Sequence, residues 1–301
     1  MRRLLALLQG ALHCPQGRLP LRVCILGNCV AQRIQNMLPS YPGFAERYTI
    51  VELPMIHLLA TPEEWDRVAQ TVLSCDVILT QPLFSYGPCN TESLRAALRA
   101  GRRFGVFASA NFEAYFPDSF VARGKTGLRF PPPFDWDSLV FFSCYVNGVS
   151  IFDVEAIYLN HPLFHEAAMK NCLSETLEKY GEREKGLDIP TFPYALRRYA
   201  GEKLFHSPRH PVDDFLRRML ADIAGWLGLE PDAPDLPVDG FGFNQWAVIT
   251  RHHSFFRFPE QAYFVVAGNR VSIEDMAMTY YTFYDFHPHV VEANRHRAIA
   301  V

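Results

Sequence analysis

The sequence predicts a three-layer α/β fold, with a mostly parallel sheet and flanking helices in an SGNH- or flavodoxin-like layout. Three observations predict it. Short β-prone runs alternate with helical segments over about 90 residues, as in parallel sheets covered by helices. The first unit joins a strand to a helix through a tight turn. The helices that follow carry recognisable start signals. An irregular C-terminal extension is expected after this core.

The first unit is Leu21–Leu38. Its apolar run from Val23 to Leu26 predicts a strand, Gly27-Asn28-Cys29 predicts a turn, and the apolar spacing from Val30 to Leu38 predicts an amphipathic helix. Cys29 would then lie at the carboxyl end of the strand, where open α/β sheets bind ligands. Free backbone N–H groups and the helix dipole favour a thiolate there. We therefore expect a functional site around Cys29.

Two more helices and three more strands complete the predicted sheet. A Thr-Pro-Glu-Glu run from Thr61 supplies an N-cap hydroxyl, a first-turn proline and carboxylates, and predicts a helix to about Leu73. Thr91 is expected to cap a second helix that Gly101 closes. The predicted strands are Tyr48–Leu53, Asp76–Thr80 and Arg103–Phe107.

The loops after the strands should gather at one edge of the sheet. Right-handed crossovers are the default for such units, and they bring the carboxyl ends of parallel strands together. The four loops expected at this edge are Asn28-Cys29, Pro54–His57, Gln81–Tyr86 and Ala108–Asn111. They define the predicted site.

The second half of the chain gives a weaker pattern. Its predicted elements are a strand over Trp136–Val146, a helix from Leu163 to Tyr180, a charged surface linker over Gly181–Gly186, a helix over Thr191–Tyr199, a loop over Lys203–Pro211 and an amphipathic helix over Val212–Leu227. The aromatic, β-prone runs Trp246–Thr250, Tyr263–Val266 and Tyr280–Phe283 could form a hairpin extension or a lid. The expected organisation is a leading helix (1–20), a core domain (21–228) and an extension packed on it (229–301), joined by a proline-rich connector at Glu230–Asp239.

Composition excludes several classes of protein. The net charge of -3 argues against nucleic acid as an obligatory partner. No apolar run approaches the ~20 residues of a membrane-spanning helix. Seven cysteines without a CxxC pair predict neither a zinc ribbon nor a disulfide framework, and indicate a reducing cytoplasm. No metal is expected, because prolines interrupt the helix on which His206 and His210 would both be ligands.

The predicted edge carries residues suited to acyl chemistry. Cys29 could attack an acyl group or line a ligand pocket. The side chain of Asn28 and the N–H groups of Cys29 and Val30 could stabilise an oxyanion, and Asn28 could equally be a turn residue. A histidine would serve as the base. The candidates include His57 on an edge loop and His161, with His287 and His289 ranked lower. Gln81 and Tyr86 are expected to orient the substrate.

Three motifs together carry a resemblance to a known family. They are the strand-turn Ile25–Cys29, the Asp76–Pro82 element (D-x-x-x-T-Q-P) and the Leu204–Pro211 element (L-F-H-x-x-x-H-P). Over roughly residues 21–228 the chain resembles WcbI-type capsule polysaccharide biosynthesis proteins, which are associated with coenzyme A binding and O-acetylation of a capsular sugar. It departs from the family pattern at Val30, at Arg209 and at Cys144–Gly148.

The resemblance implies transfer of an acyl group, expected to be acetyl, from coenzyme A to a sugar hydroxyl. It makes His210 the first choice of base. The coenzyme would contact Gly27 and Val30 at the turn, and a set of polar and cationic residues around the late motif: Arg197, Lys203, His206 and Arg209. Two alternatives remain open at this point. One is an SGNH-like ester hydrolase that uses Cys29 without coenzyme A, and the other is a non-catalytic coenzyme A- or sugar-binding protein.

Overall fold

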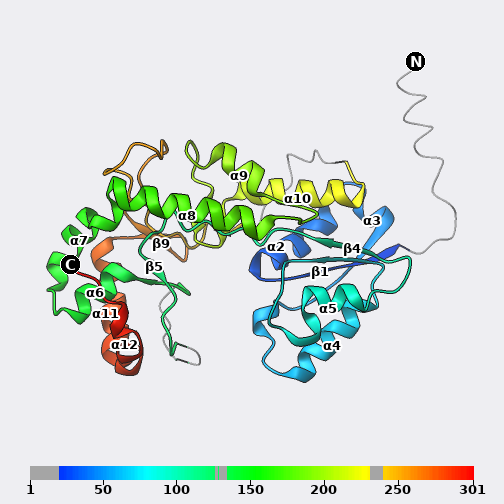
Figure 1. Cartoon of the computed structure of the whole chain (residues 1–301), viewed down its shortest axis with the longest axis horizontal. Helices are drawn as coiled ribbons and strands as arrows, with labels where there is room; N and C mark the ends of the chain where they lie inside the picture. Colours follow the sequence, from blue (N-terminus) through cyan, green and yellow to red (C-terminus); the bar gives the residue numbers. More distant parts are fainter. Residues whose placement is uncertain (1–19, 126–127, 129–133, 231–239) are drawn as a thin grey trace, which may run out of the picture.

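The computed structural model describes residues 20–125, 128, 134–230 and 240–301. The molecule is elongated, with the β-sheet and its helices at one end and a mostly helical part at the other (Figure 1). The C-terminus lies at the helical end. The expected leading helix and most of the Glu230–Asp239 connector lie outside the described residues.

The main sheet has four parallel strands in the order β2-β1-β3-β4. The strands are β1 (Leu21–Leu26), β2 (Tyr48–Val51), β3 (Val77–Thr80) and β4 (Arg103–Val106). β1 and β3 are central, with Val23 opposite Val77. The predicted parallel sheet is confirmed.

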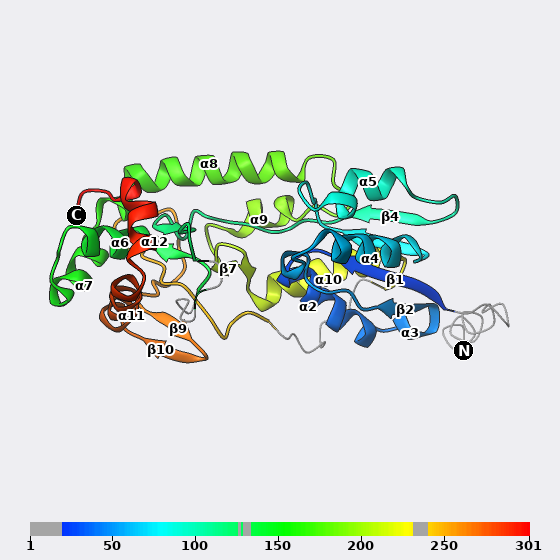
Figure 2. The same ribbon diagram turned by 90° about the horizontal axis from the view of Figure 1, so that it is seen from below.

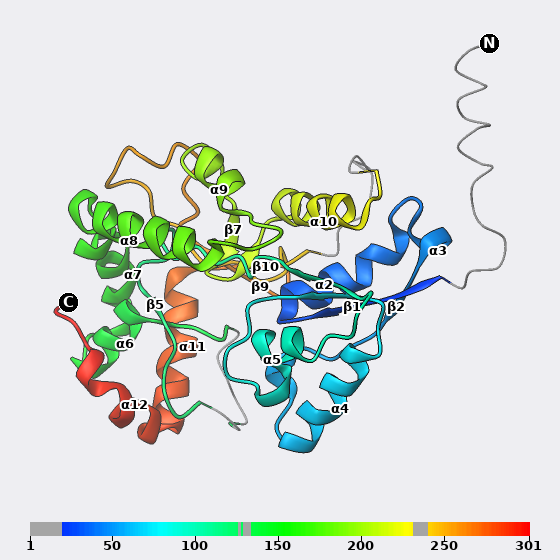
Figure 3. The same cartoon turned by 45° about the vertical axis from the view of Figure 1, so that its right-hand side comes forward.

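Helices cover both faces of this sheet, which makes three layers. Val23, Ile25 and Leu79 face one large core cluster that also contains buried residues of α2 (Cys29–Met37) and α10 (Asp213–Leu227). Cys24 and Ile78 face a second cluster, with α4 (Pro62–Leu73) and α5 (Thr91–Ala96). Figure 3 shows the two pairs of helices on opposite sides of the sheet. This alternation confirms the predicted three-layer α/β class, because successive strand residues point to opposite faces.

The helix caps agree with the sequence in one case and differ in another. The predicted start of α4 is confirmed, since the Oγ1 of Thr61 accepts from the N–H of Glu64 while the Glu64 carboxylate accepts from the N–H of Thr61. The predicted cap of α5 is wrong by one residue. The Oδ1 of Asn90 caps that helix, and the Oγ1 of Thr91 accepts from the N–H of Leu83 instead. The helix also ends at Ala96, before Gly101.

The predicted strand over Trp136–Val146 is wrong. After the two-residue strand β6 (Asp137–Ser138), which pairs with β5 (Ser119–Phe120), the segment forms helix α6 (Leu139–Val146). The hydroxyl of Ser138 caps this helix by accepting from the N–H of Phe141. Five of its eight residues are buried. An apolar run of this length does not distinguish a buried helix from a buried strand.

Three more helices follow α6 in the chain. They are α7 (Ile151–Asn160), α8 (Glu166–Glu184) and α9 (Phe192–Arg198). α8 extends along the molecule toward the sheet (Figure 2), and it includes most of the predicted Gly181–Gly186 linker, so that linker prediction is wrong. The chain after α8 adds to the sheet edge, because Ile189 forms a parallel bridge with Phe107.

The C-terminal residues share the core of the helical part. Of the predicted β-prone runs, Tyr263–Val266 supplies strand β9 (Phe264–Val266), which forms a hairpin with β10 (Asn269–Val271), a segment outside those runs. Helices α11 (Ile273–Phe286) and α12 (Pro288–Asn294) follow. The β-prone run Tyr280–Phe283 is wrong as a strand, because it lies in α11, which packs on α6 and α7. The remaining short elements are α3 (Phe44–Arg47) and the 3-10 turns Leu38–Ser40, Ile56–Leu58, Gly87–Cys89, Pro162–Phe164 and Arg295–Arg297. No helix in the described ranges has the length and apolarity needed to span a membrane.

Candidate active site

The four predicted edge loops meet at the carboxyl ends of the strands. The N–H of Ile56 donates to the carbonyl of Gly27 at 2.9 Å. The N–H of Asn28 donates to the Oε1 of Gln81 at 2.8 Å, and the Nε2 of Gln81 donates to the carbonyl of Ala108 at 3.4 Å. Gln81 is buried and bonds backbone at both ends of its amide. Gln81 therefore holds the turn that carries Cys29 in place.

Two residues of the turn have local structural reasons for being there. A Cβ atom at Gly27 would lie 2.3 Å from the Oε1 of Gln81, so only glycine allows this close approach. Asn28 is the N-cap of α2, and its Oδ1 accepts from the N–H of Val30 at 2.9 Å. The N–H of Val30, one of the predicted oxyanion donors, is therefore already bonded.

Cys29 and His210 form a pair. The Sγ of Cys29 lies 3.4 Å from the Nε2 of His210, and the Nδ1 of His210 lies 2.9 Å from the Oγ of Ser207. Ser207 and His210 belong to a small antiparallel hairpin of β7 (Phe205–Ser207) and β8 (His210–Pro211). The segment predicted as a loop is therefore a hairpin, and it aligns a thiol, an imidazole and a hydroxyl.

The pair is uncharged near neutral pH. Burial raises the pKa of the Cys29 thiol, although nearby N–H groups of Val30 and Cys29 and the charge of Arg209 oppose this. The expected thiolate is therefore wrong for this structure, because desolvation outweighs the helix terminus. Burial also lowers the pKa of His210 to about 4, with Arg209 and Arg33 acting in the same direction and Asp135 against it.

Aromatic rings fix the orientation of the imidazole. The ring of Phe241 stacks on His210 with centroids 4.5 Å apart, and Trp136 meets it edge-on at 5.6 Å. Sequence reasoning missed both rings, as well as Ser207 and Asp135. Only Ser207 had a usable signal, since it lies within the Leu204–Pro211 motif.

The other predicted residues around the late motif are either half-buried or exposed. Lys203 donates to the Oε1 of Gln261 at 2.6 Å, and burial lowers its pKa to about 8. Burial and Lys203 lower the pKa of His206 to about 4. Arg209 is exposed beside the pair. Arg197 lines a separate open cavity of about 300 Å³ between α9 and α10.

The remaining predicted residues are spread over the molecule. His57 is exposed on the loop after β2. Tyr86 packs edge-on against Trp65 of α4. Both pack on the apolar cluster on the face of the sheet opposite to α2. His161 is in the helical part, where its Nδ1 accepts from the N–H of Leu163 and its Nε2 lies 3.1 Å from the carbonyl of Ala300. The structure therefore does not bring Tyr86 or His161 to Cys29.

The lower-ranked histidines also lie away from the pair. His287 and His289 are next to each other at the junction of α11 and α12, with ring centroids 5.8 Å apart. Across the described ranges, no three side chains of His, Cys, Asp or Glu are grouped to hold a metal ion. The fold and the site together define the class: a three-layer α/β protein with a thiol–imidazole–hydroxyl set at the carboxyl edge of its parallel sheet.

Comparison with known proteins identifies the family. The family model described as polysaccharide biosynthesis enzyme WcbI matches residues 22–232. The chain belongs to this family of polysaccharide biosynthesis enzymes. A solved structure of WcbI superposes with a TM-score of 0.66 at 17% identity, covering 94% of this chain and 100% of the other. That structure is described as the native protein without a disulfide bond between coenzyme A and one of its cysteines. No curated protein sequence gives a significant match.

Proposed function

We propose that the protein transfers an acyl group, acetyl in the simplest case, from coenzyme A to a sugar hydroxyl during polysaccharide assembly. The observation that carries the proposal is the contact of Cys29 with the Nε2 of His210, whose Nδ1 is bonded to Ser207. Family membership supports a sugar acceptor. The description of the solved WcbI structure associates coenzyme A with a cysteine of that protein. By analogy, Cys29 would face the sulfur end of the acyl donor.

The charges around the pair suit such a donor. Arg209 is exposed and lies close enough to influence the pKa values of both Cys29 and His210. Guanidinium groups bind phosphate oxygens well. Arg209 would therefore hold a phosphate of the coenzyme close to the Cys29–His210 pair. Lys203 and His206 are half-buried and are less suited to phosphate contact.

His210 would act as the base. In a direct route, its Nε2 takes the proton of the sugar hydroxyl as the oxygen attacks the acyl carbon, and then gives the proton to the departing sulfur. Ser207 accepts the Nδ1–H and keeps Nε2 free of a proton beforehand. The nearby charge of Asp135 favours the imidazolium as it forms. The N–H of Cys29 is the available backbone donor for the oxyanion.

A two-step route would use the same atoms. His210 would first take the proton of Cys29, and the sulfur would then attack the acyl carbon and form a thioester. The bond from the acyl carbon to the sulfur of coenzyme A breaks, and His210 gives the proton to that departing sulfur. In the second step the sugar oxygen would attack this thioester while His210 takes the hydroxyl proton. The acyl–Sγ bond breaks, and His210 returns the proton to Cys29. Both routes need a proton transfer at the moment of attack, since the pair is neutral at rest.

Calorimetric titration with coenzyme A and acetyl-coenzyme A tests the proposal, using the wild type and Cys29→Ala. Acetyl transfer to a sugar is then followed by mass spectrometry. No binding by the wild type would refute the transferase. Tight binding without transfer to any sugar would favour the non-catalytic role, and acetate release from an acetylated glycan without coenzyme A would favour a hydrolase.

A second measurement separates the two routes. Cys29→Ser should abolish the two-step route if a thioester is required, whereas the direct route should survive it. Mass spectrometry of the protein after brief exposure to acetyl-coenzyme A should detect acetylated Cys29 only in the two-step route.

A further inference from the structure

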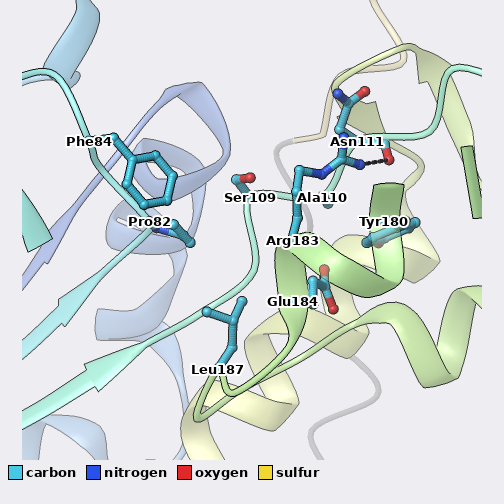
Figure 4. Close-up of a pocket in the computed structure, with 9 residues that line it drawn as sticks. All are labelled: Pro82, Phe84, Ser109, Ala110, Asn111, Tyr180, Arg183, Glu184 and Leu187. Carbon is cyan, nitrogen blue, oxygen red and sulfur yellow. Dashed lines mark hydrogen bonds between the residues drawn. The ribbon is translucent and has the colours of Figure 1, made fainter. Parts of the chain in front are cut away.

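A cavity of about 90 Å³ lies beyond the carboxyl ends of β3 and β4. Its wall includes Phe84 from the loop after β3, Ser109 from the loop after β4, Arg183 from the last turn of α8, and Leu187 from the segment after α8. Figure 4 shows Ser109 between Phe84 and Arg183, with Leu187 on the other side of the cavity. Neither of the proposed routes uses any of these side chains.

The guanidinium of Arg183 is held in place by two contacts. Its Nη2 donates to the carbonyl of Asn111 at 3.0 Å, and its guanidinium carbon lies 5.6 Å from the ring centre of Tyr180. Among the described residues, no carboxylate lies within ion-pairing distance of the guanidinium, although ten other pairs are formed elsewhere. The remaining N–H donors are therefore available to an anionic ligand.

The carboxylate of the neighbouring Glu184 forms its hydrogen bonds elsewhere. Glu184 lines the cavity, but its oxygens accept from the N–H groups of Thr191 and Phe192 and from the Thr191 hydroxyl. These groups are at the amino end of α9, where a carboxylate is stabilised by the helix terminus. Both oxygens of Glu184 are therefore engaged at the start of α9, and among the described residues Arg183 forms no hydrogen bond to them. Burial raises the pKa of this carboxyl, and the nearby charge of Arg183 acts against that rise.

Phe84 supplies an apolar platform beside the cation. Its side chain is 78% exposed and lines the cavity, so a face of the ring is open to a ligand. The C–H faces of a sugar ring pack well on such a surface, while the hydroxyls at its rim need hydrogen-bond partners. Two groups of the same wall could supply these hydrogen bonds: Ser109 and the Oδ1 of Asn111, which is buried and without a partner among the described residues.

Hydrogen bonds connect the wall of this cavity to the segments that carry Cys29 and His210. The carbonyl of Ala108 accepts from Gln81, which also holds the turn before Cys29. The N–H of Phe112 donates to the carbonyl of Pro208 at 2.9 Å, in the hairpin that carries His210. The segment from Ala108 to Phe112 therefore connects the cavity to both members of the pair.

We propose that this cavity is an acceptor subsite for a carboxylated sugar. Arg183 pairs with the carboxylate, and Phe84 packs on the face of the sugar ring. The inference rests on the proposed function, and it adds that the acceptor is acidic. A phosphate of coenzyme A is the other source of an anion for Arg183, and the experiment below separates the two sources.

The test is binding of glucuronate and of a short glucuronate-containing oligosaccharide, measured by saturation-transfer NMR and calorimetry without coenzyme A. The wild type should bind glucuronate in preference to glucose. Arg183→Gln should weaken this binding about tenfold or more, as expected for loss of a charged hydrogen-bonded pair. Phe84→Ala should weaken binding of both sugars. Arg99→Gln is the matched control, because Arg99 is exposed and precedes β4 at the opposite edge of the sheet.

Coenzyme A and 3′-dephospho-coenzyme A are titrated into the same variants. If Arg183→Gln leaves both affinities unchanged while sugar binding falls, the subsite is confirmed. If it instead removes the preference for coenzyme A over the dephospho form, Arg183 reads a coenzyme phosphate and the proposal is wrong. Acetyl transfer with no preference for glucuronate would refute the subsite alone. Glucuronate binding without coenzyme A binding would refute the proposed function alone.

Discussion

The Nε2 of His210 lies 3.4 Å from the Sγ of Cys29, although 181 residues separate them in the chain. The strand-turn-helix unit supplies the thiol, and a hairpin just before α10 supplies the imidazole. α10 packs in the same core cluster as α2, so the two elements are held together by burial of apolar surface on one face of the sheet. The site therefore depends on tertiary packing as well as on the local turn.

Replacement of His210 by asparagine should abolish most activity without preventing binding of the acyl donor. Loss of a positioned base typically lowers the rate by a factor of about 10² to 10⁴, and we expect a loss of about this size in kcat/KM. Steady-state kinetics of acetyl transfer would measure it, with calorimetry on coenzyme A as the binding control. His296→Asn is the matched control, because His296 is exposed in the helical part. Equal losses in the two variants would contradict the role of His210.

Ser207 should act through the imidazole. Ser207→Ala removes the partner of the half-buried Nδ1, so kcat should fall by about tenfold while KM for the donor changes little. The free energy of unfolding should fall by about 1–3 kcal/mol, because Nδ1 is left without a partner. Ser207→Thr keeps the hydroxyl and should restore much of kcat. A purely structural serine would give loss of stability without this recovery.

The sequence predicted the sheet and the position of Cys29, because both follow from local patterns. The apolar runs, the turn at Gly27 and the capping box at Thr61 are readable within a few residues. It did not predict α6, whose buried apolar run fits a strand equally well. Nor could it find Phe241 or Asp135, which reach His210 only through the packing of distant segments. The protonation of Cys29 was missed for a similar reason, since burial is a property of the whole fold.

Stability should fall as the pH drops from 6.5 toward 4. Burial lowers the pKa values of His206 and His210 to about 4 from the ordinary 6.5, so the unfolded chain binds more protons than the folded chain between these values. Their contribution is complete above pH 6.5 and is lost as the pH falls through this window. Urea unfolding at pH 7, 6 and 5 would measure it. The His210→Asn variant should show a shallower dependence, and an unchanged slope would contradict the lowered pKa.

Gly27→Ala should disturb the turn beneath the site. The added Cβ would lie 2.3 Å from the Oε1 of Gln81 and 2.8 Å from the Cβ of Ala31, so the helix and the strand must separate. Strain of this kind typically costs about 1–3 kcal/mol of stability. Thermal unfolding would show the loss, together with reduced donor binding. Gly201→Ala is the control, since a Cβ at that position meets only the carbonyl of Arg198 at 4.0 Å.

The thiol of Cys29 should titrate above its ordinary range in the free protein. Burial raises its pKa, and the lowered pKa of His210 removes the positive charge that would otherwise stabilise a thiolate. Alkylation by iodoacetamide, followed by peptide mapping, should therefore be slower for Cys29 than for glutathione at pH 7 and should accelerate only at alkaline pH. Arg209→Gln should raise the midpoint further, because Arg209 lowers this pKa. A half-maximal rate below pH 7 would mean that the resting pair is a thiolate and an imidazolium, and the proton transfer assigned to His210 in the two-step route would then precede binding of the donor.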